Sequence, residues 1–389
     1  MKETFPEGKS DLFAAFIQRC TCLAGPQGLS AMITMQSWMF LSSFEKLRRT
    51  MLRKQWIVSM LHLGTRAFDS IGGEVVSSTA FVIENVPPSR RANASARRGS
   101  FVRIVDGKSE AEKITMLDRA RHTREAEDGF HGASPEDFAV IPGSPIVYWL
   151  SEKIRASFWN FPPLDTRSRS AKGLVTADNE SFVRLWWEIE LRDFGLGYAD
   201  RESAKRSKRR WFPYAKGGEF RRWAGNMESV VDWEDDGRRI QTTLTSDGSR
   251  VRATNLNLDR IFKEGIAWTV VTSGQQAFRL VRAGALFDAA AGICQSTTNE
   301  DHLALLNSNV ANILLSAINP TLNLHPGYLG AIPIPNDITM YTIGDVRALI
   351  NNSQDDWDGF ETSWQFASSP LVAISQELHS LQRWLSDSK

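Results

Sequence analysis

Basic and aromatic residues are interleaved over a short segment near the middle of this 389-residue chain. Positions 201 to 222 hold nine Lys and Arg residues and only two acids, which gives a local net charge of +7. Such cations neutralise DNA phosphates, Arg also hydrogen-bonds guanine edges, and aromatic rings stack on bases. The segment therefore predicts contact with nucleic acid. The alternative is a solvated charged face that the acids at 228–236 offset.

Ten residues at the end of this segment are the predicted DNA contacts. The cations would meet phosphates or base edges, the aromatic side chains would pack nearby, and the glycine pair would let the backbone approach closely. The predicted contacts are Lys208, Arg209, Arg210, Tyr214, Lys216, Gly217, Gly218, Arg221, Arg222 and Trp223.

Other short motifs do not complete the pattern that their chemistry needs. Two Gly-Lys-Ser tripeptides, at 8–10 and 107–109, lack the earlier glycine of a phosphate-binding loop. The glycines at 195 and 197 lack the third glycine of a dinucleotide loop. Three cysteines and six scattered histidines show no metal-ligand spacing. We therefore predict no metal site and assign no catalytic residue to this chain.

The overall composition is that of an ordinary globular protein. Apolar residues make up 42%, charged residues 23%, and the net charge is +1, which excludes a polycationic coat of nucleic acid but permits a local basic patch. Three cysteines are too few for a disulfide framework, and no apolar run reaches about 18 residues. We expect a cytoplasmic protein of two or three domains without membrane contact.

Helices and strands alternate in the N-terminal part. The pair at 10–11 is typical of a helix N-cap, apolar residues follow at helical spacing, and the Gly-Pro pair at 25–26 predicts the end of that helix. The apolar run at 29–35 predicts a buried strand. A helix at 43–53 and strands at 56–63 and 78–83 complete an α/β layer, about half of a doubly wound sheet.

The pattern changes beyond position 85. A charged helix is expected at 110–128, with a solvated face. From 146 to 335, short aromatic-rich apolar runs alternate with turns, which predicts a mixed α/β or mainly β module. A helix at 303–318 is expected to end before the proline at 320, and the pattern is helical again beyond 345.

Longer segments resemble one family in their order along the chain. WFPYAKGGEFRRWAGN at 211–226 and VVDWEDDG at 230–237 are similar to a hallmark of the adenine-specific DNA methyltransferases of BREX phage-defence systems, the PglX-type family. Further blocks that resemble this family stand at 7–20, 31–48, 67–85, 173–188, 262–274, 304–335 and 356–366. The resemblance covers nearly the whole chain.

The resemblance implies an α/β fold: a partial Rossmann-like methyltransferase sheet followed by a mixed α/β target-recognition domain. The domains it implies are the C-terminal part of a catalytic domain at 1–86, a linker or charged spacer at 87–145, the DNA-binding target-recognition domain at 146–338, and the start of a helical C-terminal region at 339–389.

Two motifs of the family are missing from the sequence. The family holds the flipped adenine with an Asn-Pro-Pro-Tyr/Phe motif and binds S-adenosylmethionine through an earlier glycine-rich loop, and neither occurs here. We therefore expect a fragment that begins downstream of the catalytic motif and does not bind S-adenosylmethionine by itself. Gln36, Trp38 and Phe68 are weaker candidates for the border of the base pocket, with a core role as the alternative.

The function implied by the resemblance is part of a site-specific DNA adenine-N6 methyltransferase, with target recognition as the main contribution and double-stranded DNA as the partner. The alternative is a non-catalytic DNA-binding or assembly module. Such a module would act with an upstream methyltransferase fragment or with another BREX protein. Whether the chain is an enzyme on its own stays open at this point.

Overall fold

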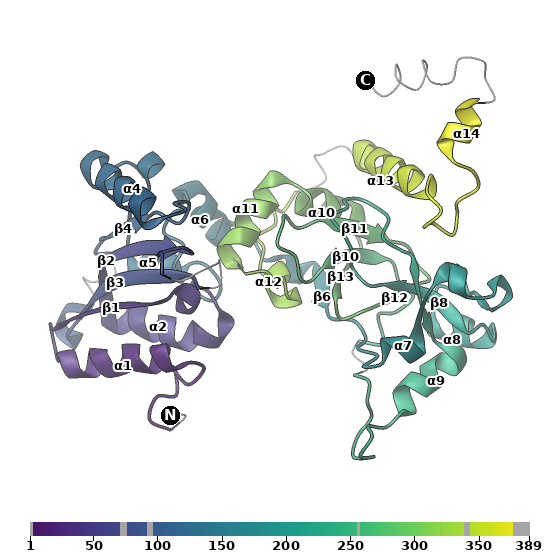
Figure 1. Ribbon diagram of the computed structural model, residues 1–389, viewed down its shortest axis with the longest axis horizontal. Helices are drawn as coiled ribbons and strands as arrows, with labels where there is room; N and C mark the ends of the chain where they lie inside the picture. Colours follow the sequence, from purple (N-terminus) through teal and green to yellow (C-terminus); the bar gives the residue numbers. More distant parts are fainter. Residues whose placement is uncertain are drawn as a thin grey trace. The chain divides into compact units, whose positions relative to one another are not determined.

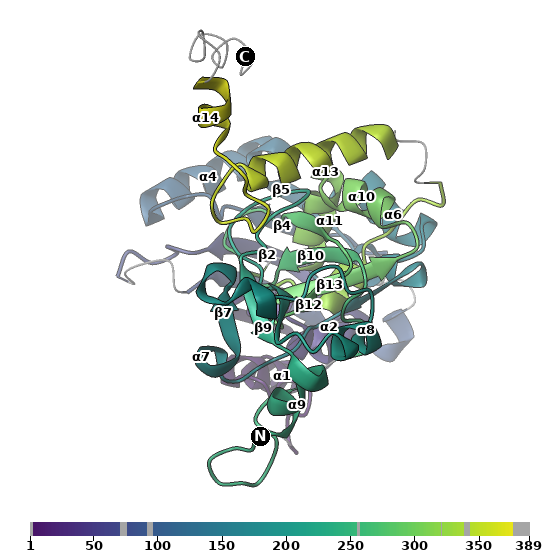
Figure 2. The same ribbon diagram turned by 90° about the vertical axis from the view of Figure 1, so that its right-hand side faces the viewer.

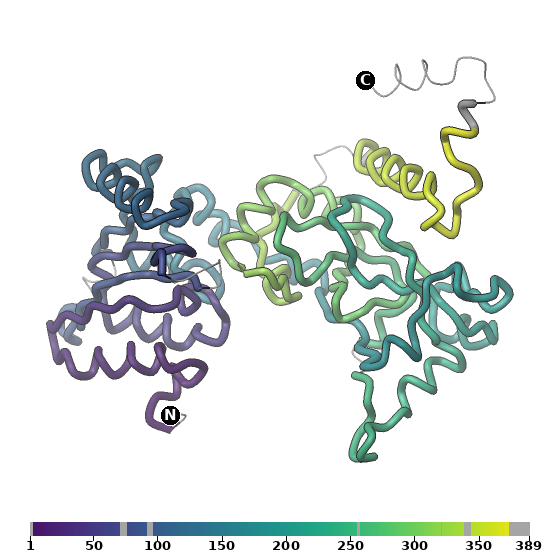
Figure 3. The backbone as a smooth tube through the Cα atoms, viewed as in Figure 1, coloured from purple at the N-terminus to yellow at the C-terminus, as the bar shows by residue number. Residues whose placement is uncertain are grey.

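The computed structural model describes residues 3–70, 76–91, 96–254, 257–319, 321–337 and 343–375. The chain divides into two compact units (Figures 1 and 3). The first comprises Met1–Phe161 with Ser316–Thr321, and the second comprises Pro162–Leu315 with Leu322–Lys389. Each unit has its own sheets, and we describe the two separately.

A five-stranded sheet forms the centre of the first unit, in the order β1-β3-β2-β4-β5. The strands are β1 (Leu29–Met35), β2 (Gln55–Gly64), β3 (Ser78–Asn85), β4 (Gly99–Arg103) and β5 (Phe130–Ala133). Strand β3 runs antiparallel between β1 and β2, β4 pairs parallel with β2, and β5 pairs antiparallel with β4. Strands β1, β2 and β4 therefore point the same way, so their carboxyl ends meet at one end of the sheet.

Amphipathic helices accompany this sheet. They are α1 (Leu12–Ala24), α2 (Glu45–Lys54), α4 (Glu110–Thr123), α5 (Pro135–Ala139) and α6 (Glu152–Asn160). Helix α1 buries Ile17, packs along β1 and ends at Gly25, whose φ of +67° suits glycine. Helix α2 buries Leu47, and α4 packs Ala120 against β4. The helix–strand order predicted for the N-terminal part is confirmed.

The segment at 87–145 differs from the linker that the sequence predicted. Its described residues hold β4, α4, β5 and α5, and β4 extends the sheet from β2. Only Phe101 and Val102 of β4 are large and apolar, and the strand lies between Arg-rich stretches, so no alternating pattern marks it. The charge of α4 also hides its packing, because Lys113 is buried and donates from Nζ to the carbonyls of Leu63 and Ile104.

Strand β1 is less buried than the sequence predicted. Among the described strands it pairs only with β3, so it is an edge strand, and one of its faces is open. Leu29 and Ile33 are 63% and 60% exposed. The continuous apolar run predicts burial on both faces, but the tertiary structure leaves one face of β1 uncovered.

Two four-stranded sheets build the second unit, in the orders β11-β10-β13-β6 and β12-β8-β9-β7. The first holds β6 (Ser168–Ala171), β10 (Gly265–Thr269), β11 (Phe278–Val281) and β13 (Ala291–Ser296), all antiparallel. The second holds β7 (Val183–Leu185), β8 (Trp211–Ala215), β9 (Ser229–Asp232) and β12 (Leu286–Phe287), with β12 parallel to β8. The expected mixed α/β character of this region is confirmed.

The core of the second unit comes from short strands that are buried on both faces. Phe212 and Tyr214 of β8 pack with Trp233 and Phe262. The helices are α7 (Asn179–Phe182), α8 (Arg201–Arg206), α9 (Glu234–Thr242), α10 (Asn299–Leu306), α11 (Asn309–Ile318), α12 (Pro326–Gly330), α13 (Ile343–Asp358) and α14 (Pro370–Ser375). Helix α13 lies beside α10 (Figure 2), and Arg347 pairs with Glu300 at 2.9 Å.

The single helix predicted at 303–318 is two helices, α10 and α11. The break falls at Asn307, whose side chain accepts a hydrogen bond from the backbone N–H of Phe278 and donates one to its carbonyl, both at 3.0 Å. This pairing to β11 fixes Asn307 beside the strand, so the helix restarts two residues later. No helix among the described residues combines the length and apolar character that a membrane span requires.

Candidate nucleic-acid interface

The basic segment folds around a buried strand. All five residues of β8 are buried, so the cations lie before it, on α8 and the following turn, and after it, on the turn towards β9. Asp200 caps the N-terminus of helix α8, and its carboxylate accepts a hydrogen bond from the Ser203 N–H at 2.7 Å. The strand thus divides the cations into two groups at its opposite ends.

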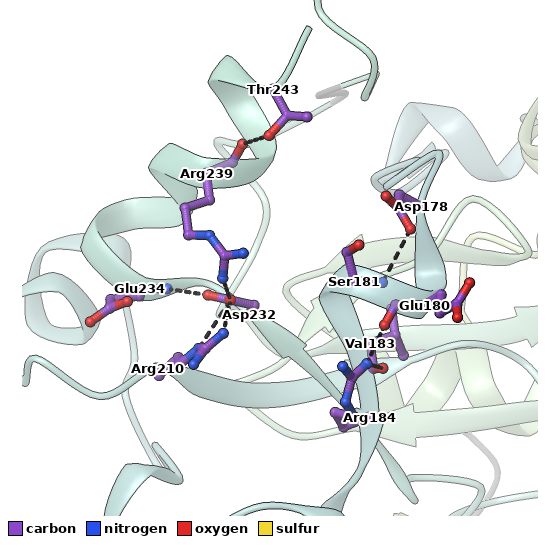
Figure 4. Close-up of polar contacts among 10 residues, drawn as sticks. All are labelled: Asp178, Glu180, Ser181, Val183, Arg184, Arg210, Asp232, Glu234, Arg239 and Thr243. Atoms are coloured by element: carbon purple, nitrogen blue, oxygen red, sulfur yellow. Dashed lines mark hydrogen bonds and ion pairs between the residues drawn. The ribbon is translucent and has the colours of Figure 1, made fainter. Parts of the chain in front are cut away.

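Three of the nine cations, Arg201, Arg210 and Arg221, are neutralised by carboxylates from other segments. Arg210 and Arg239 converge on the Asp232 carboxylate, whose side chain is only 1% exposed (Figure 4). Arg201 makes a bidentate pair with Asp236, and Arg221 pairs with Asp356 of α13 at 2.6 Å. The acidic stretch at 228–236 therefore offsets part of the patch, as the alternative interpretation held for it.

A left-handed turn places one of these carboxylates. Asp235, Asp236 and Gly237 have φ of 50°, 60° and 71° in succession, which is rare for residues with side chains. The turn directs Asp236 towards Arg201, and the resulting pair joins α9 to α8. The basic helix is therefore held at a fixed place beside α9.

The other six cations make no ion pair with any described residue. They are Lys205, Arg206, Lys208, Arg209, Lys216 and Arg222. Arg222 lies over the ring of Phe220 at 5.4 Å, and that ring is 60% exposed. A cation beside an exposed aromatic ring can contact a phosphate while the ring stacks on a base. The structure thus leaves most of the predicted cationic contacts free for an anion.

Several predicted contacts have structural roles instead. Tyr214 is fully buried, and its hydroxyl donates to the Leu174 carbonyl at 3.2 Å. Burial, reinforced by Asp288, raises the pKa of Tyr214 well above its usual value, so the hydroxyl stays protonated. Tyr214 is a core residue, and its prediction as a DNA contact is corrected. Arg210 and Arg221 are held by their carboxylates in this structure.

The glycine pair closes a turn against β10. Gly217 and Gly218 have φ of 92° and 110°, and the Gly218 carbonyl accepts a hydrogen bond from the Thr269 hydroxyl at 2.9 Å. Trp223 follows in the left-handed region at φ 74° and pairs through its backbone with Phe278 and Leu280. These three residues fix the path of the chain after β8, and their contact with DNA stays a prediction.

In the first unit, the weaker candidates lie near the carboxyl ends of the parallel strands. Gln36 follows β1, and its Oε1 lies 2.7 Å from Nε2 of His62 on β2. Nδ1 of His62 lies 3.1 Å from the Tyr148 hydroxyl. Trp38 is fully buried against Phe81, which supports the core alternative for it, and Phe68 is 36% exposed.

His62 was missed by the sequence reasoning. Burial, helped by the charges of Arg103 and Lys113, lowers the pKa of His62 to about 3, so the ring is neutral at ordinary pH. The Gln36 amide oxygen can only accept, so Nε2 of the neutral ring carries the proton and donates to it, and Nδ1 accepts from the Tyr148 hydroxyl. A histidine near the end of an otherwise apolar strand was the available signal. The described residues contain no group of three potential metal ligands.

Comparisons with known proteins show similarity to restriction-modification enzymes. Residues 1–68 match the family described as Eco57I restriction-modification methylase. Among solved structures, the chain is similar to the type IIL restriction-modification enzyme MmeI in complex with DNA, at 9% identity and a TM-score of 0.47, over 96% of this chain and 52% of that one. The family match therefore covers the N-terminal part of the first unit.

Two curated relatives match almost the whole chain. The chain is 34% identical over 383 residues to the adenine-specific methyltransferase PglX of Lacticaseibacillus casei (strain Zhang), and 36% identical over 377 residues to BrxX of Escherichia coli O9:H4 (strain HS). These alignments cover 96% and 95% of this chain but 31% and 29% of the relatives. The chain is therefore similar to PglX-type adenine-specific methyltransferases along almost its whole length, and it spans about three tenths of those relatives.

Proposed function

We propose that this chain supplies target recognition to an adenine-specific DNA methyltransferase of a BREX phage-defence system. The observation that carries the proposal is identity of 34–36% with such methyltransferases along almost the whole chain. The second unit would hold the DNA duplex, and the first unit would contribute part of the methyltransferase sheet. The domain division expected from the sequence is retained as a proposal, with 87–145 assigned to the first unit rather than to a linker.

The unpaired cations support DNA as the partner. Methylation of an adenine amine inside a duplex requires the base to be extruded, so the enzyme must hold the flanking duplex firmly. Contacts from Lys205, Arg206, Lys208, Arg209, Lys216 and Arg222 would neutralise six phosphates. Six contacts predict a salt slope of about −5, and hence a roughly 10³-fold loss of affinity between 50 and 200 mM salt.

S-adenosylmethionine is the methyl donor that the family implies, and we propose that its site lies outside this chain. Cofactor loops of this kind need closely spaced glycines after a strand. The turn after β1, at Gln36–Met39, has no glycine, and the Asp106 carboxylate beyond β4 is held by Arg103 at 3.1 Å. Neither of these two turns provides such a loop, which supports the proposal that this chain alone does not bind the cofactor.

Fluorescence anisotropy with the full chain and a labelled 25-base-pair duplex tests the proposal. We expect binding at 50 mM salt and a log–log salt slope near −5. Isothermal calorimetry with S-adenosylmethionine should give no heat of binding. Absence of duplex binding at low salt would refute the recognition role. Methylation by the isolated chain would refute the proposal that the cofactor site lies outside this chain.

A second candidate, an assembly role, rests on the uncovered surface of the first unit. The edge strand β1 exposes Leu29 and Ile33, and α1 beside it exposes Leu12 and Leu23 by 59% and 68%. An exposed apolar edge strand offers backbone groups to a further strand. We propose that a methyltransferase segment carrying the missing motifs adds here, and coexpression of that segment from BrxX should give a copurifying complex. An Ile33→Lys substitution should prevent copurification, and an unaffected complex would refute this edge as the contact.

A further inference from the structure

We propose that the hairpin at residues 243–252 enters the major groove of DNA and that Arg250 reads base edges there. This inference rests on the proposed DNA-binding function and names an element of recognition outside the basic segment. The hairpin follows α9 and projects from the second unit as a narrow loop (Figure 1).

Backbone hydrogen bonds make this loop a two-stranded ribbon. The Arg252 N–H donates to the Thr243 carbonyl at 2.8 Å, and the Thr245 N–H donates to the Arg250 carbonyl at 2.9 Å. Leu244 and Val251 face each other across the two segments as an isolated antiparallel bridge. The ribbon therefore has a defined pairing, which a loop selected only for length would not need.

Both ends of the ribbon are anchored in the core of the second unit. Ile240 of α9, just before it, and Ala253, just after it, belong to the same buried cluster. Thr254 and Val175 exchange two backbone hydrogen bonds, and Arg252 pairs with Asp178 at 2.8 Å. The ribbon is thus fixed at its base, so its tip is presented in a defined direction.

The tip is closed by one carboxylate. Asp247 accepts hydrogen bonds from the Thr245 hydroxyl and from the Ser249 N–H and hydroxyl. These hydrogen bonds lower the pKa of Asp247 to about 2, so the carboxylate is ionised. Gly248 completes the turn at φ 68°. An ionised carboxylate at the tip opposes contact with phosphates and leaves base edges as the surface that the tip can meet.

The exposed side chains have the chemistry for base edges. Leu244 is 53% and Val251 38% exposed on the two arms of the ribbon. Such side chains contact thymine methyl groups. Arg250 is exposed and makes no ion pair with any described residue, so its guanidinium is available for a bidentate contact with guanine.

The dimensions agree with this position. The major groove is about 12 Å wide and 8.5 Å deep and admits a two-stranded β-ribbon, whose backbones lie about 4.8 Å apart. The arm at 243–245 precedes the turn at the tip, and three extended residues reach about 10 Å, which exceeds the groove depth. Helix α8, joined to α9 by the Arg201–Asp236 pair, would bring unpaired cations to the neighbouring backbone.

Selection from a pool of random duplexes, followed by sequencing, tests the proposal with the full chain. We compare wild type with Arg250→Ala and Arg250→Lys, and use Arg192→Ala as the control, because Arg192 is 77% exposed and paired with Glu190. Both Arg250 variants should lose discrimination at one or two adjacent positions by roughly 5- to 150-fold, since Lys lacks the bidentate fork. The control should keep the wild-type motif.

The outcomes separate this inference from the proposed function. If wild type binds no duplex, the proposed function itself fails. If wild type selects a motif and both Arg250 variants select the same motif, base reading by the ribbon is refuted while DNA recognition stands. If the variants lose affinity equally for all duplexes and keep the motif, Arg250 contacts the DNA phosphate backbone, which would also overturn the proposal.

Discussion

Asp232 holds Arg210, which precedes β8, and Arg239 of α9, and its replacement by Asn should have two opposite effects. The substitution keeps the shape of the side chain but removes the charge that holds Arg210 and Arg239. The carboxylate is 1% exposed, whereas the two guanidinium groups are 41% and 49% exposed. The free energy of unfolding should therefore fall, while Arg210 and Arg239 become available to bind DNA phosphates.

The stability effect follows from this exposure. Half-exposed guanidinium groups retain much of their hydration, so each pair is worth nearer ~1 kcal/mol than the several kcal/mol of a fully buried pair. Two pairs give a loss of about 2 kcal/mol, which for a unit of this size corresponds to a Tm lower by about 4–8 °C. Thermal unfolding followed by circular dichroism measures this shift.

The effect on DNA binding has the other sign. Released from Asp232, Arg210 and Arg239 can add up to two phosphate contacts, so the log–log salt slope should steepen by up to about 2. Fluorescence anisotropy between 50 and 200 mM salt measures the slope. Binding at low salt should tighten although the fold is less stable.

A neighbouring carboxylate provides the control. Asp235→Asn removes the same charge three residues further along the chain, but Asp235 is 44% exposed and its partner Arg238 is 73% exposed. Asn also tolerates the left-handed conformation of this position. We expect a loss below about 0.5 kcal/mol. Equal destabilisation by the two substitutions, or an unchanged salt slope in Asp232→Asn, would refute the reasoning.

Three further predictions concern the unpaired cations, the buried Tyr214 hydroxyl and the buried His62 ring. Lys208→Ala with Arg209→Ala should make the salt slope shallower by about 2, because neither side chain is paired, and a slope equal to that of Arg192→Ala would count against these contacts. Tyr214→Phe should cost about 1 kcal/mol in urea unfolding through the lost bond to Leu174 and should leave duplex affinity unchanged, so weakened DNA binding would return Tyr214 to the interface. The lowered pKa of His62, about 3 against an unfolded value near 6.5, means that the unfolded chain binds the extra proton between these values. The stability that neutral His62 supplies is therefore complete above pH 6.5 and declines as the pH falls towards 3, by up to about 1.4 kcal/mol per pH unit. Unfolding measured from pH 7 to pH 5 should show a flatter dependence in His62→Asn than in wild type, and parallel curves would contradict this role.

Local patterns in the sequence sufficed where each element carries its own signal. Helix α1 has apolar residues at helical spacing and a glycine at its end, and β2 and β3 are long apolar strands, so all three were predicted close to their observed bounds. The basic segment was also evident, because nine cations with two acids stand out in any window. The family resemblance, carried by long ordered blocks, is confirmed by the curated relatives.

Only the tertiary structure decided which of those charges are free. Arg221 meets Asp356 across 135 positions of sequence, and Arg210 meets Asp232 across 22, and nothing in either local pattern specifies the pairing. Strand β4 escaped prediction because two apolar residues cannot establish a period. The ribbon that presents Arg250 depends on anchors at Ile240 and Ala253. Sequence fixes which side chains are available through composition and short-range periodicity, whereas pairing and exposure depend on contacts between distant segments, which form only when the chain folds.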